Sequence, residues 1–185
     1  MQNASYCGSL VATMFAVTAG WLTLLPTTAP AATNQVTAKA AFEQLKGLAG
    51  DWRGQAAHGG DASDTTVTYR VVGAGSAVME TLFPGTPHEM VTMYHLDGDQ
   101  LVLTHYCAAG NQPRMALELQ KSTPALLVFE FTGGSNLDPA KDMHMHAGRI
   151  RLLSADSLES EWDSYQRGQK TGAAKFTLKR EPAKK

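Results

Sequence analysis

Ten short segments of alternating apolar and polar residues dominate the sequence after residue 50, and they recur at intervals of about ten residues. Gly, Pro, Asp or Asn stands between them. They lie near residues 51–57, 65–72, 76–83, 89–96, 100–106, 114–120, 126–131, 144–153, 157–165 and 174–179. No helical stretch remains that could connect parallel strands. The pattern therefore predicts an all-β fold, an antiparallel up-and-down barrel of about ten strands whose closure removes exposed edges.

One short helix is expected before the first strand. Thr37 can cap its start, Phe42, Leu45 and Leu48 fall on one face, and Gly50 follows as a stop. We expect the segment 32–50 to hold this helix and residues 51–185 to form one barrel domain.

The first 38 residues contain no Asp, Glu, Lys or Arg. A mostly apolar stretch over 11–25 is followed by Ala29, Pro30 and Ala31, with small residues at the positions that a signal peptidase reads. This pattern predicts a signal peptide at 1–31 and a secreted or periplasmic protein with no stable membrane span after cleavage. An uncleaved membrane anchor is the alternative interpretation, although the stretch is short and rich in Thr for a span.

The charge balance gives no sign of a nucleic-acid partner, and the number of cysteines excludes an intramolecular disulfide in the barrel. The chain carries 16 basic and 17 acidic side chains, without the basic excess typical of proteins that bind nucleic acid. Cys107 is the only thiol left after the predicted cleavage, so the barrel has no intramolecular disulfide. Burial is the ordinary role of such a thiol, and catalysis together with His105, two residues before it, is the alternative.

The predicted inner face of one strand is partly polar. Leu158, Ser160, Trp162 and Ser164 alternate with acidic residues, so they share the face that points inward. Two serines beside a tryptophan suit a lumen that holds a ligand or water, and they equally suit the taper of a filled barrel.

The N-terminal part of the predicted barrel resembles a known superfamily. A short helix ending in Gly50-Asp51-Trp52-Arg53-Gly54, followed by a ten-strand meander, is similar to the calycin-type barrels: lipocalins, fatty-acid-binding proteins and nitrobindin-like proteins. The resemblance implies that Trp52 closes one end of the barrel against a basic residue of the final strand, Lys179 or Arg180. It also implies a family of secreted lipocalin-like domains without an assigned activity.

The same comparison excludes one cofactor. The second lipocalin motif, Thr-Asp-Tyr, does not occur, and no histidine follows His146 that would match the haem ligand of nitrobindins. Haem binding is therefore not carried over by the resemblance, and we expect no cofactor.

The histidines are the residues most able to carry chemistry. His144 and His146 share a strand face with Ile150 and Leu152, so both point inward unless Gly148 forms a bulge that turns them toward solvent. His105 shares a face with Leu101, Leu103 and Cys107. His95 lies just before the predicted turn at Asp97-Gly98.

A metal site is one hypothesis from these positions. His144 and His146, two residues apart on a strand, can bind a divalent metal such as zinc when a third ligand comes from a neighbouring strand. His105 is the first choice for that ligand, with His95 and Cys107 as others. The alternative is that these histidines only form hydrogen bonds with carbonyl groups or water.

A further group of polar residues surrounds the segment 84–87. Glu80, His88 and Glu89 are expected at an exposed loop on the barrel rim, where a carboxylate beside a histidine can serve in acid-base chemistry but is also ordinary for a surface loop. The common phosphate-binding, nucleophile-elbow and Cys-x-x-Cys motifs are absent, so the sequence gives no enzyme class.

Together these features predict a barrel that binds a small, largely apolar molecule in its lumen. The candidate ligand-binding residues are His95, His105, His146, Ser160, Trp162 and Ser164. A metal-binding barrel that uses His105, His144 and His146, and an envelope protein that acts through its outer surface, are the alternatives. The oligomeric state is left open.

Overall fold

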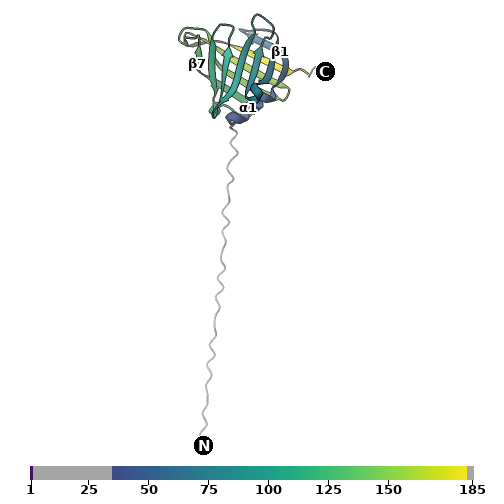
Figure 1. Ribbon diagram of the computed structural model, residues 1–185, viewed down its shortest axis with the longest axis vertical. Helices are drawn as coiled ribbons and strands as arrows, with labels where there is room; N and C mark the ends of the chain where they lie inside the picture. The colour runs from purple at the N-terminus through teal and green to yellow at the C-terminus, as the bar shows by residue number, and fades with distance from the viewer. Residues whose placement is uncertain (2–34, 183–185) are drawn as a thin grey trace. The chain divides into compact units, whose positions relative to one another are not determined.

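A closed barrel of ten antiparallel strands, preceded by one short helix, confirms the predicted fold class (Figure 1). The computed structural model describes Met1 and residues 35–182, so the predicted signal peptide lies, apart from Met1, outside the described residues. Each strand pairs with its neighbours in sequence, and β1 and β10 close the barrel. The elements are α1 (Ala38–Gly47), β1 (Gly50–His58), β2 (Asp61–Val72), β3 (Ala77–Leu82), β4 (Met90–Asp97), β5 (Gln100–Tyr106), β6 (Gln112–Leu117), β7 (Leu126–Ser135), β8 (His144–Ser154), β9 (Ser157–Gln166) and β10 (Gln169–Arg180).

The helix begins where the sequence predicts and ends earlier. The hydroxyl of Thr37 accepts a hydrogen bond from the backbone N–H of Ala40 and caps the first turn. The expected stop at Gly50 is wrong, because Leu48 ends the helix and Gly50 already begins β1. Phe42 and Leu45 are buried in the same core as the barrel residues, so α1 lies against one end of the barrel. Within the described part of the chain, no helix is long and apolar enough to cross a membrane.

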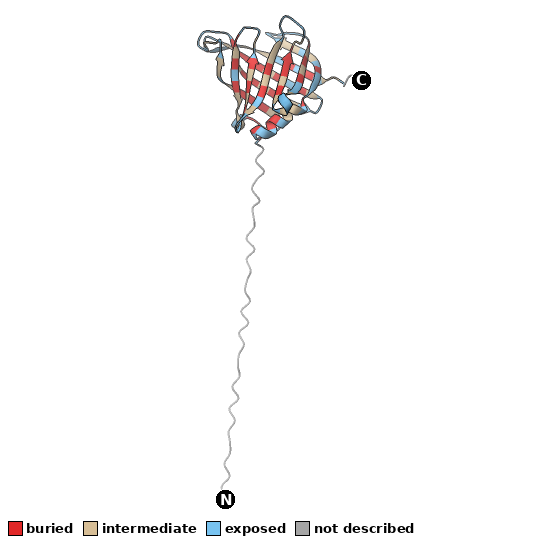
Figure 2. Cartoon of the chain, in the orientation of Figure 1, coloured by how far each residue is buried: buried red, intermediate tan, exposed pale blue. Residues whose placement is uncertain are grey.

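Buried and exposed residues alternate along the strands, as Figure 2 shows. On β5, Leu101, Leu103 and His105 are buried while the residues between them are not. This alternation is what gives each strand one face toward the core and one toward water.

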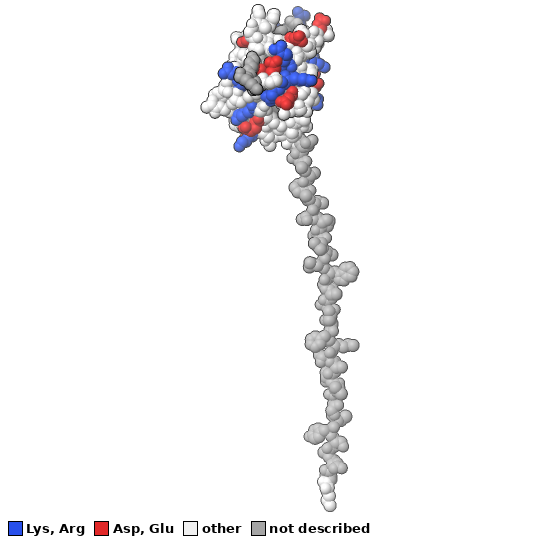
Figure 3. Space-filling view, turned by 90° about the vertical axis from the view of Figure 1, so that its right-hand side faces the viewer, with Lys and Arg blue, Asp and Glu red and all other residues white. Residues whose placement is uncertain are grey.

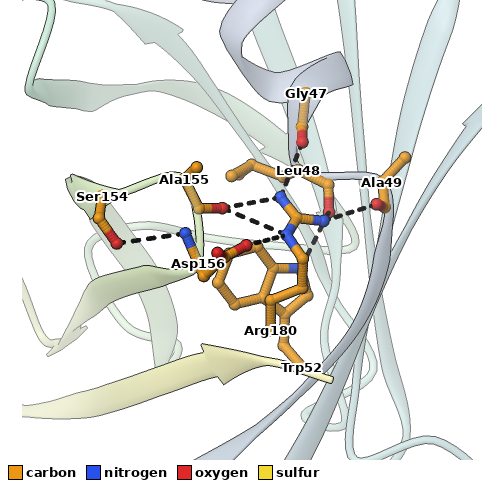
Figure 4. Close-up of polar contacts among 8 residues, drawn as sticks. All are labelled: Gly47, Leu48, Ala49, Trp52, Ser154, Ala155, Asp156 and Arg180. Atoms are coloured by element: carbon orange, nitrogen blue, oxygen red, sulfur yellow. Dashed lines mark hydrogen bonds and ion pairs between the residues drawn. The ribbon is translucent and has the colours of Figure 1, made fainter. Parts of the chain in front are cut away.

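Trp52 and Arg180 lie at the end of the barrel where α1 packs. Trp52 is fully buried, and its indole Nε1–H donates a hydrogen bond to the carbonyl oxygen of Leu48 at 2.9 Å. Arg180, rather than Lys179, stacks its guanidinium on the indole, 4.4 Å from the ring centre. It also donates hydrogen bonds to carbonyl oxygens of Gly47, Ala49 and Ala155 and pairs with Asp156 (Figure 4). Because α-helices leave their last carbonyls unpaired, Arg180 also serves as the C-terminal cap of α1.

Gly54 permits the close approach of β1 and β10 next to this pair. A Cβ atom at position 54 would lie 1.8 Å from the carbonyl oxygen of Thr177, a backbone atom that cannot move aside. Glycine is therefore required here by packing of backbone against backbone.

The outer surface carries charges of both signs. Figure 3 shows acidic and basic side chains intermingled on one face of the barrel. On the wall of β8–β10, Asp163 pairs with Arg149 and Lys170, and Glu161 pairs with Arg149 and Lys175. The charges of these side chains are therefore paired with opposite charges on this wall.

Candidate functional site: a cavity in the barrel lumen

A cavity of about 700 Å³ occupies the end of the lumen opposite the Trp52–Arg180 pair. This volume falls within the roughly 300–1,000 Å³ typical of small-molecule sites. His58, Ser63, Thr86 and His88 are exposed residues at its mouth. Deeper in, the wall is formed by Leu82, Phe83, Met90, His105, Met145, Trp162, Ala174 and Phe176.

Among the described residues, the deep wall is apolar apart from the side chains of His105 and Trp162. Apart from Phe83, which lies in a loop, its residues come from β3, β4, β5, β8, β9 and β10, and most sit at positions that the alternation of the strands turns inward. Phe83 and Phe176 contact each other with ring centres 5.7 Å apart. The two methionines, Met90 and Met145, supply flexible apolar side chains that adapt to the shape of a guest.

Trp162 is the first of the polar side chains in this wall. It pairs with Gly148 across β8 and β9, and a Cβ at position 148 would lie 3.1 Å from its ring. The absence of a side chain at Gly148 therefore lets the indole lie against β8. Trp162 is 3% exposed, and its Nε1–H has no hydrogen-bond partner among the described residues.

His105 is the second polar side chain in the cavity wall. It is 1% exposed, and its ring is tilted by 31° against that of Trp162 with centres 5.1 Å apart. Its Nδ1 is hydrogen bonded to the hydroxyl of Thr92 at 2.9 Å, whereas Nε2 has no partner within the described chain. Burial lowers the pKa of His105 from 6.5 to about 4, so the ring is neutral at physiological pH.

The protonation of His105 gives a prediction that needs no ligand. The pKa of His105 is lower in the folded protein than in the unfolded chain. The contribution of the neutral His105 ring to stability is therefore complete above pH 6.5 and is lost as pH falls through about 4. We expect ¹⁵N NMR of the ring to report a neutral imidazole with one bare nitrogen from about pH 5 to about pH 8. A ring that titrates near pH 6.5 would contradict the buried environment.

Glu80 is separated from His105 by Thr92, its neighbour on β4, and it does not lie on the rim. Its expected place at an exposed loop is wrong, because it is an inward-facing residue of β3 and is fully buried. Tyr69 donates its hydroxyl to Glu80 Oε1 at 2.6 Å, and Tyr94 donates to Oε2 at 2.8 Å. Burial raises the pKa of Glu80, while the hydroxyls of Tyr69, Tyr94 and Thr92 act in the opposite sense.

His144 and His146 form a separate cluster. Gly148 is regularly paired with Trp162, and the bulge of this strand lies instead at His146, between Met145 and Ala147, so the prediction that both histidines point inward is wrong. His144 Nε2 and His146 Nδ1 are hydrogen bonded at 2.9 Å, and His146 is stacked between Phe131 and Tyr165. Neither histidine lines the cavity. The bulge therefore places them in an aromatic cluster in the barrel wall.

One hydrogen bond of this pair fixes the position of a proton. His144 Nδ1 lies 2.9 Å from the carbonyl oxygen of Asp142, which can only accept, so Nδ1 carries the hydrogen. The other ring nitrogen, Nε2, is the one that lies within hydrogen-bond distance of His146 Nδ1. His105 is not part of this cluster. Among residues 35–182, no group of three or more His, Cys, Asp and Glu side chains is arranged to hold a metal ion.

The remaining predicted site residues lie away from the cavity wall. His95 is exposed on the outside of β4, where it borders a surface groove with Val102 and Arg114. Ser160 is buried, its hydroxyl has no hydrogen-bond partner among residues 35–182, and it does not line the cavity. Ser164 is hydrogen bonded to Thr171. Cys107 is half-buried in the turn between β5 and β6.

Two cavity residues that the sequence analysis missed as ligand-binding candidates are histidines at the mouth, His58 and His88. A signal for His58 exists in the sequence: it shares strand parity with Trp52, Gly54 and Ala56, and Trp52 is the residue expected inside. His88 lies in a loop, where parity gives no direction. Glu80 and Thr92 could have been found by the same alternation along β3 and β4.

Comparison with known proteins gives a fold and no activity. No family model matches the sequence, and no curated protein matches it. Among solved structures, the chain is similar to a protein of unknown function from the DUF3598 family of Nostoc punctiforme PCC 73102, with a TM-score of 0.53 and 16% identity. The similarity covers 82% of this chain and 53% of that one, so this chain spans about half of its neighbour's length. At this identity the likeness shows a shared barrel fold, and the lipocalin resemblance stays a prediction.

Proposed function

We propose that this protein is a carrier or receptor that binds a small, largely apolar molecule in the lumen of the barrel. The observation that carries the proposal is the cavity of about 700 Å³, whose deep wall, in the part of the chain that the structure describes, is apolar except for two side chains. Burial of ligand carbon provides affinity of about 25 cal/mol per Å² before the cost of association.

The position of the cavity supports this function. Its mouth lies at the end of the barrel away from α1, so a ligand can enter past His58 and His88 while the Trp52–Arg180 end stays closed. The charge-free first 38 residues further support an exported carrier, secreted or periplasmic, that meets its ligand outside the cytoplasm.

A plugging variant tests the function directly. Ala174 is half-buried, and its methyl group belongs to the cavity wall, so we expect Ala174→Trp to fill the lumen and to weaken binding by tenfold or more. Binding is measured with the neutral fluorescent probe N-phenyl-1-naphthylamine, whose emission rises in apolar surroundings. The variant should keep its stability, because the new side chain enters empty space.

The matched control is Ala173→Trp, the same change one residue earlier on the opposite face of β10. Ala173 pairs with Asp163, which is ion paired on the outer wall, so this variant should bind the probe like the wild type. Equal binding by both variants would contradict a lumen site. Failure of the wild-type protein to bind the probe at all would contradict the carrier function.

A further inference from the structure

The deep wall of the cavity keeps only apolar side chains accessible to a ligand. In this wall, the residues that retain exposed surface have side chains of carbon, hydrogen and sulfur: Phe83, Met90, Met145 and Ala174. His105 and Trp162 are 1% and 3% exposed, and their nitrogens His105 Nε2 and Trp162 Nε1 are buried and do not open onto the cavity. A polar group that entered the deep lumen would therefore lose its hydrogen bonds with water and would find no side-chain partner.

The mouth of the cavity has the opposite character. Its exposed residues carry hydroxyl or imidazole groups and come from two neighbouring hairpins, β1–β2 and β3–β4: His58, Ser63, Thr86 and His88. The Thr86 hydroxyl donates to the carbonyl oxygen of Phe83 at 2.9 Å, so toward a ligand it acts as an acceptor. A serine hydroxyl donates and accepts, and an imidazole donates at least one N–H. The mouth can therefore form several hydrogen bonds with a polar group.

The other end of the barrel gives a ligand no second exit. Trp52 is fully buried there, and Arg180 stacks on its indole and donates to carbonyl oxygens at the end of α1. Only one end of a bound molecule can thus remain in contact with water, and that end lies at the mouth.

We propose that the ligand is a single-chain amphiphile that enters the lumen with its apolar chain first and leaves an uncharged, hydrogen-bonding head at the mouth. The chain contacts the deep wall, and the head contacts His58, Ser63, Thr86 and His88. This proposal rests on the proposed function and specifies the ligand class and the binding orientation in the same cavity.

The lining of the cavity disfavours a charged head. Within the described part of the chain, neither Asp, Glu, Lys nor Arg lines it, so a carboxylate or an ammonium group would lose hydration without gaining a counter-ion. Acidic residues also flank the mouth histidines: Asp61 is paired with His58 across the β1–β2 hairpin, and Glu89 directly follows His88. Both are exposed, and their charge repels a carboxylate head.

Brominated ligands test the orientation, because bromine quenches tryptophan emission only at close range. The probes are 1-monodecanoylglycerols with bromine either on carbon 10, at the end of the chain, or on carbon 2, next to the head. We expect the 10-bromo compound to cause the larger loss of emission, because Trp162 belongs to the deep wall. Trp162→Phe removes that signal and should abolish the difference between the two compounds.

Three probes with the same number of chain carbons test the head by displacement of N-phenyl-1-naphthylamine: 1-monodecanoylglycerol, decanoate and decylammonium. All are used below the concentrations at which they form micelles. We expect the glycerol ester to bind about tenfold more tightly than either charged probe, because its uncharged head forms hydrogen bonds at the mouth and needs no counter-ion.

Substitutions at the mouth separate these contacts from solvation of the probes in water, which is identical for every variant. His58→Ala and His88→Ala should each weaken binding of monodecanoylglycerol by about threefold to tenfold relative to decane, which has no head. The matched control is His95→Ala, the same change at an exposed histidine on the outside of β4, and it should leave this ratio unchanged.

The outcomes distinguish the two levels of the proposal. Equal quenching by the two bromo compounds, or stronger quenching by the 2-bromo compound, would overturn the orientation while the carrier function stands. Decanoate or decylammonium that binds as tightly as the glycerol ester would overturn the uncharged head, and so would mouth variants with unchanged ratios. If neither the fluorescent probe nor any of the other compounds binds, both the carrier function and the inference are wrong.

Discussion

Replacement of Trp52 by alanine is expected to lower the free energy of unfolding by about 3–5 kcal/mol, the usual cost of removing a large aromatic side chain from a core. Trp52 has no exposed surface and contacts Tyr69 edge to face with ring centres 6.4 Å apart. Its indole N–H also holds the carbonyl oxygen of Leu48, where α1 ends. The loss therefore combines a cavity, an aromatic contact and a helix-end hydrogen bond.

Arg180 makes the effect of this substitution depend on a second residue. Its guanidinium lies on the indole and donates to carbonyl oxygens at the end of α1 and in the turn before β9 (Figure 4). We expect the double variant with Arg180→Ala to lose less stability than the sum of the two single variants, because both remove the same stacked contact. Arg180→Lys keeps the charge but not the planar fork of donors.

The measurement is urea unfolding followed by far-ultraviolet circular dichroism, since tryptophan emission changes with the substitution itself. Ser76→Ala, at an exposed turn, is a suitable control for the effect of a surface change, although it removes a local hydrogen bond to Gly73. A loss below about 1 kcal/mol in Trp52→Ala would show that the closed end of the barrel packs without the indole.

The strand pattern was sufficient to predict the barrel because alternation carries information at every residue. Each of the ten segments becomes a strand, and parity correctly turns His105 inward beside Leu101 and Leu103. Trp162 lies inside for the same reason. What alternation predicts is a direction for each side chain relative to the strand, and this holds wherever the ladder is regular.

The prediction weakens where the ladder is irregular or where residues lie in loops. A bulge at His146 places His144 and His146 away from the cavity, and no residue type marks that bulge in the sequence. His95 has the opposite parity to the buried Tyr94 and is exposed on the outside. The depth of a residue along the lumen is equally hidden, so Ser160 faces inward but lies in the filled part and not in the cavity.

Substitution of Glu80 is the second change with a large expected effect on stability. Glu80→Ala is expected to lower the free energy of unfolding by about 3 kcal/mol or more. The hydroxyls of Tyr69 and Tyr94 lose their buried acceptor, and the removed side chain leaves a cavity. Glu80→Gln keeps the shape and one acceptor oxygen, so it should cost less. Comparison of the two variants separates the loss of the hydrogen bonds from the loss of the charge.

The dependence on pH distinguishes this carboxyl from an ordinary surface glutamate. Because burial raises the pKa of Glu80 above 4.5, the folded protein holds the proton more tightly than the unfolded chain. Its contribution to stability is therefore complete below pH 4.5 and is lost as pH rises through the folded-state pKa. The glutamine variant has no such proton, so the stability of wild type relative to Glu80→Gln should fall as pH rises.

Urea unfolding of both proteins from about pH 4 to about pH 8 measures this difference in stability. The effect of His105 titration cancels from the difference because both proteins contain His105. The opposite slope, with wild type gaining on Glu80→Gln as pH rises, would mean that the three hydroxyls outweigh burial and hold Glu80 as a carboxylate.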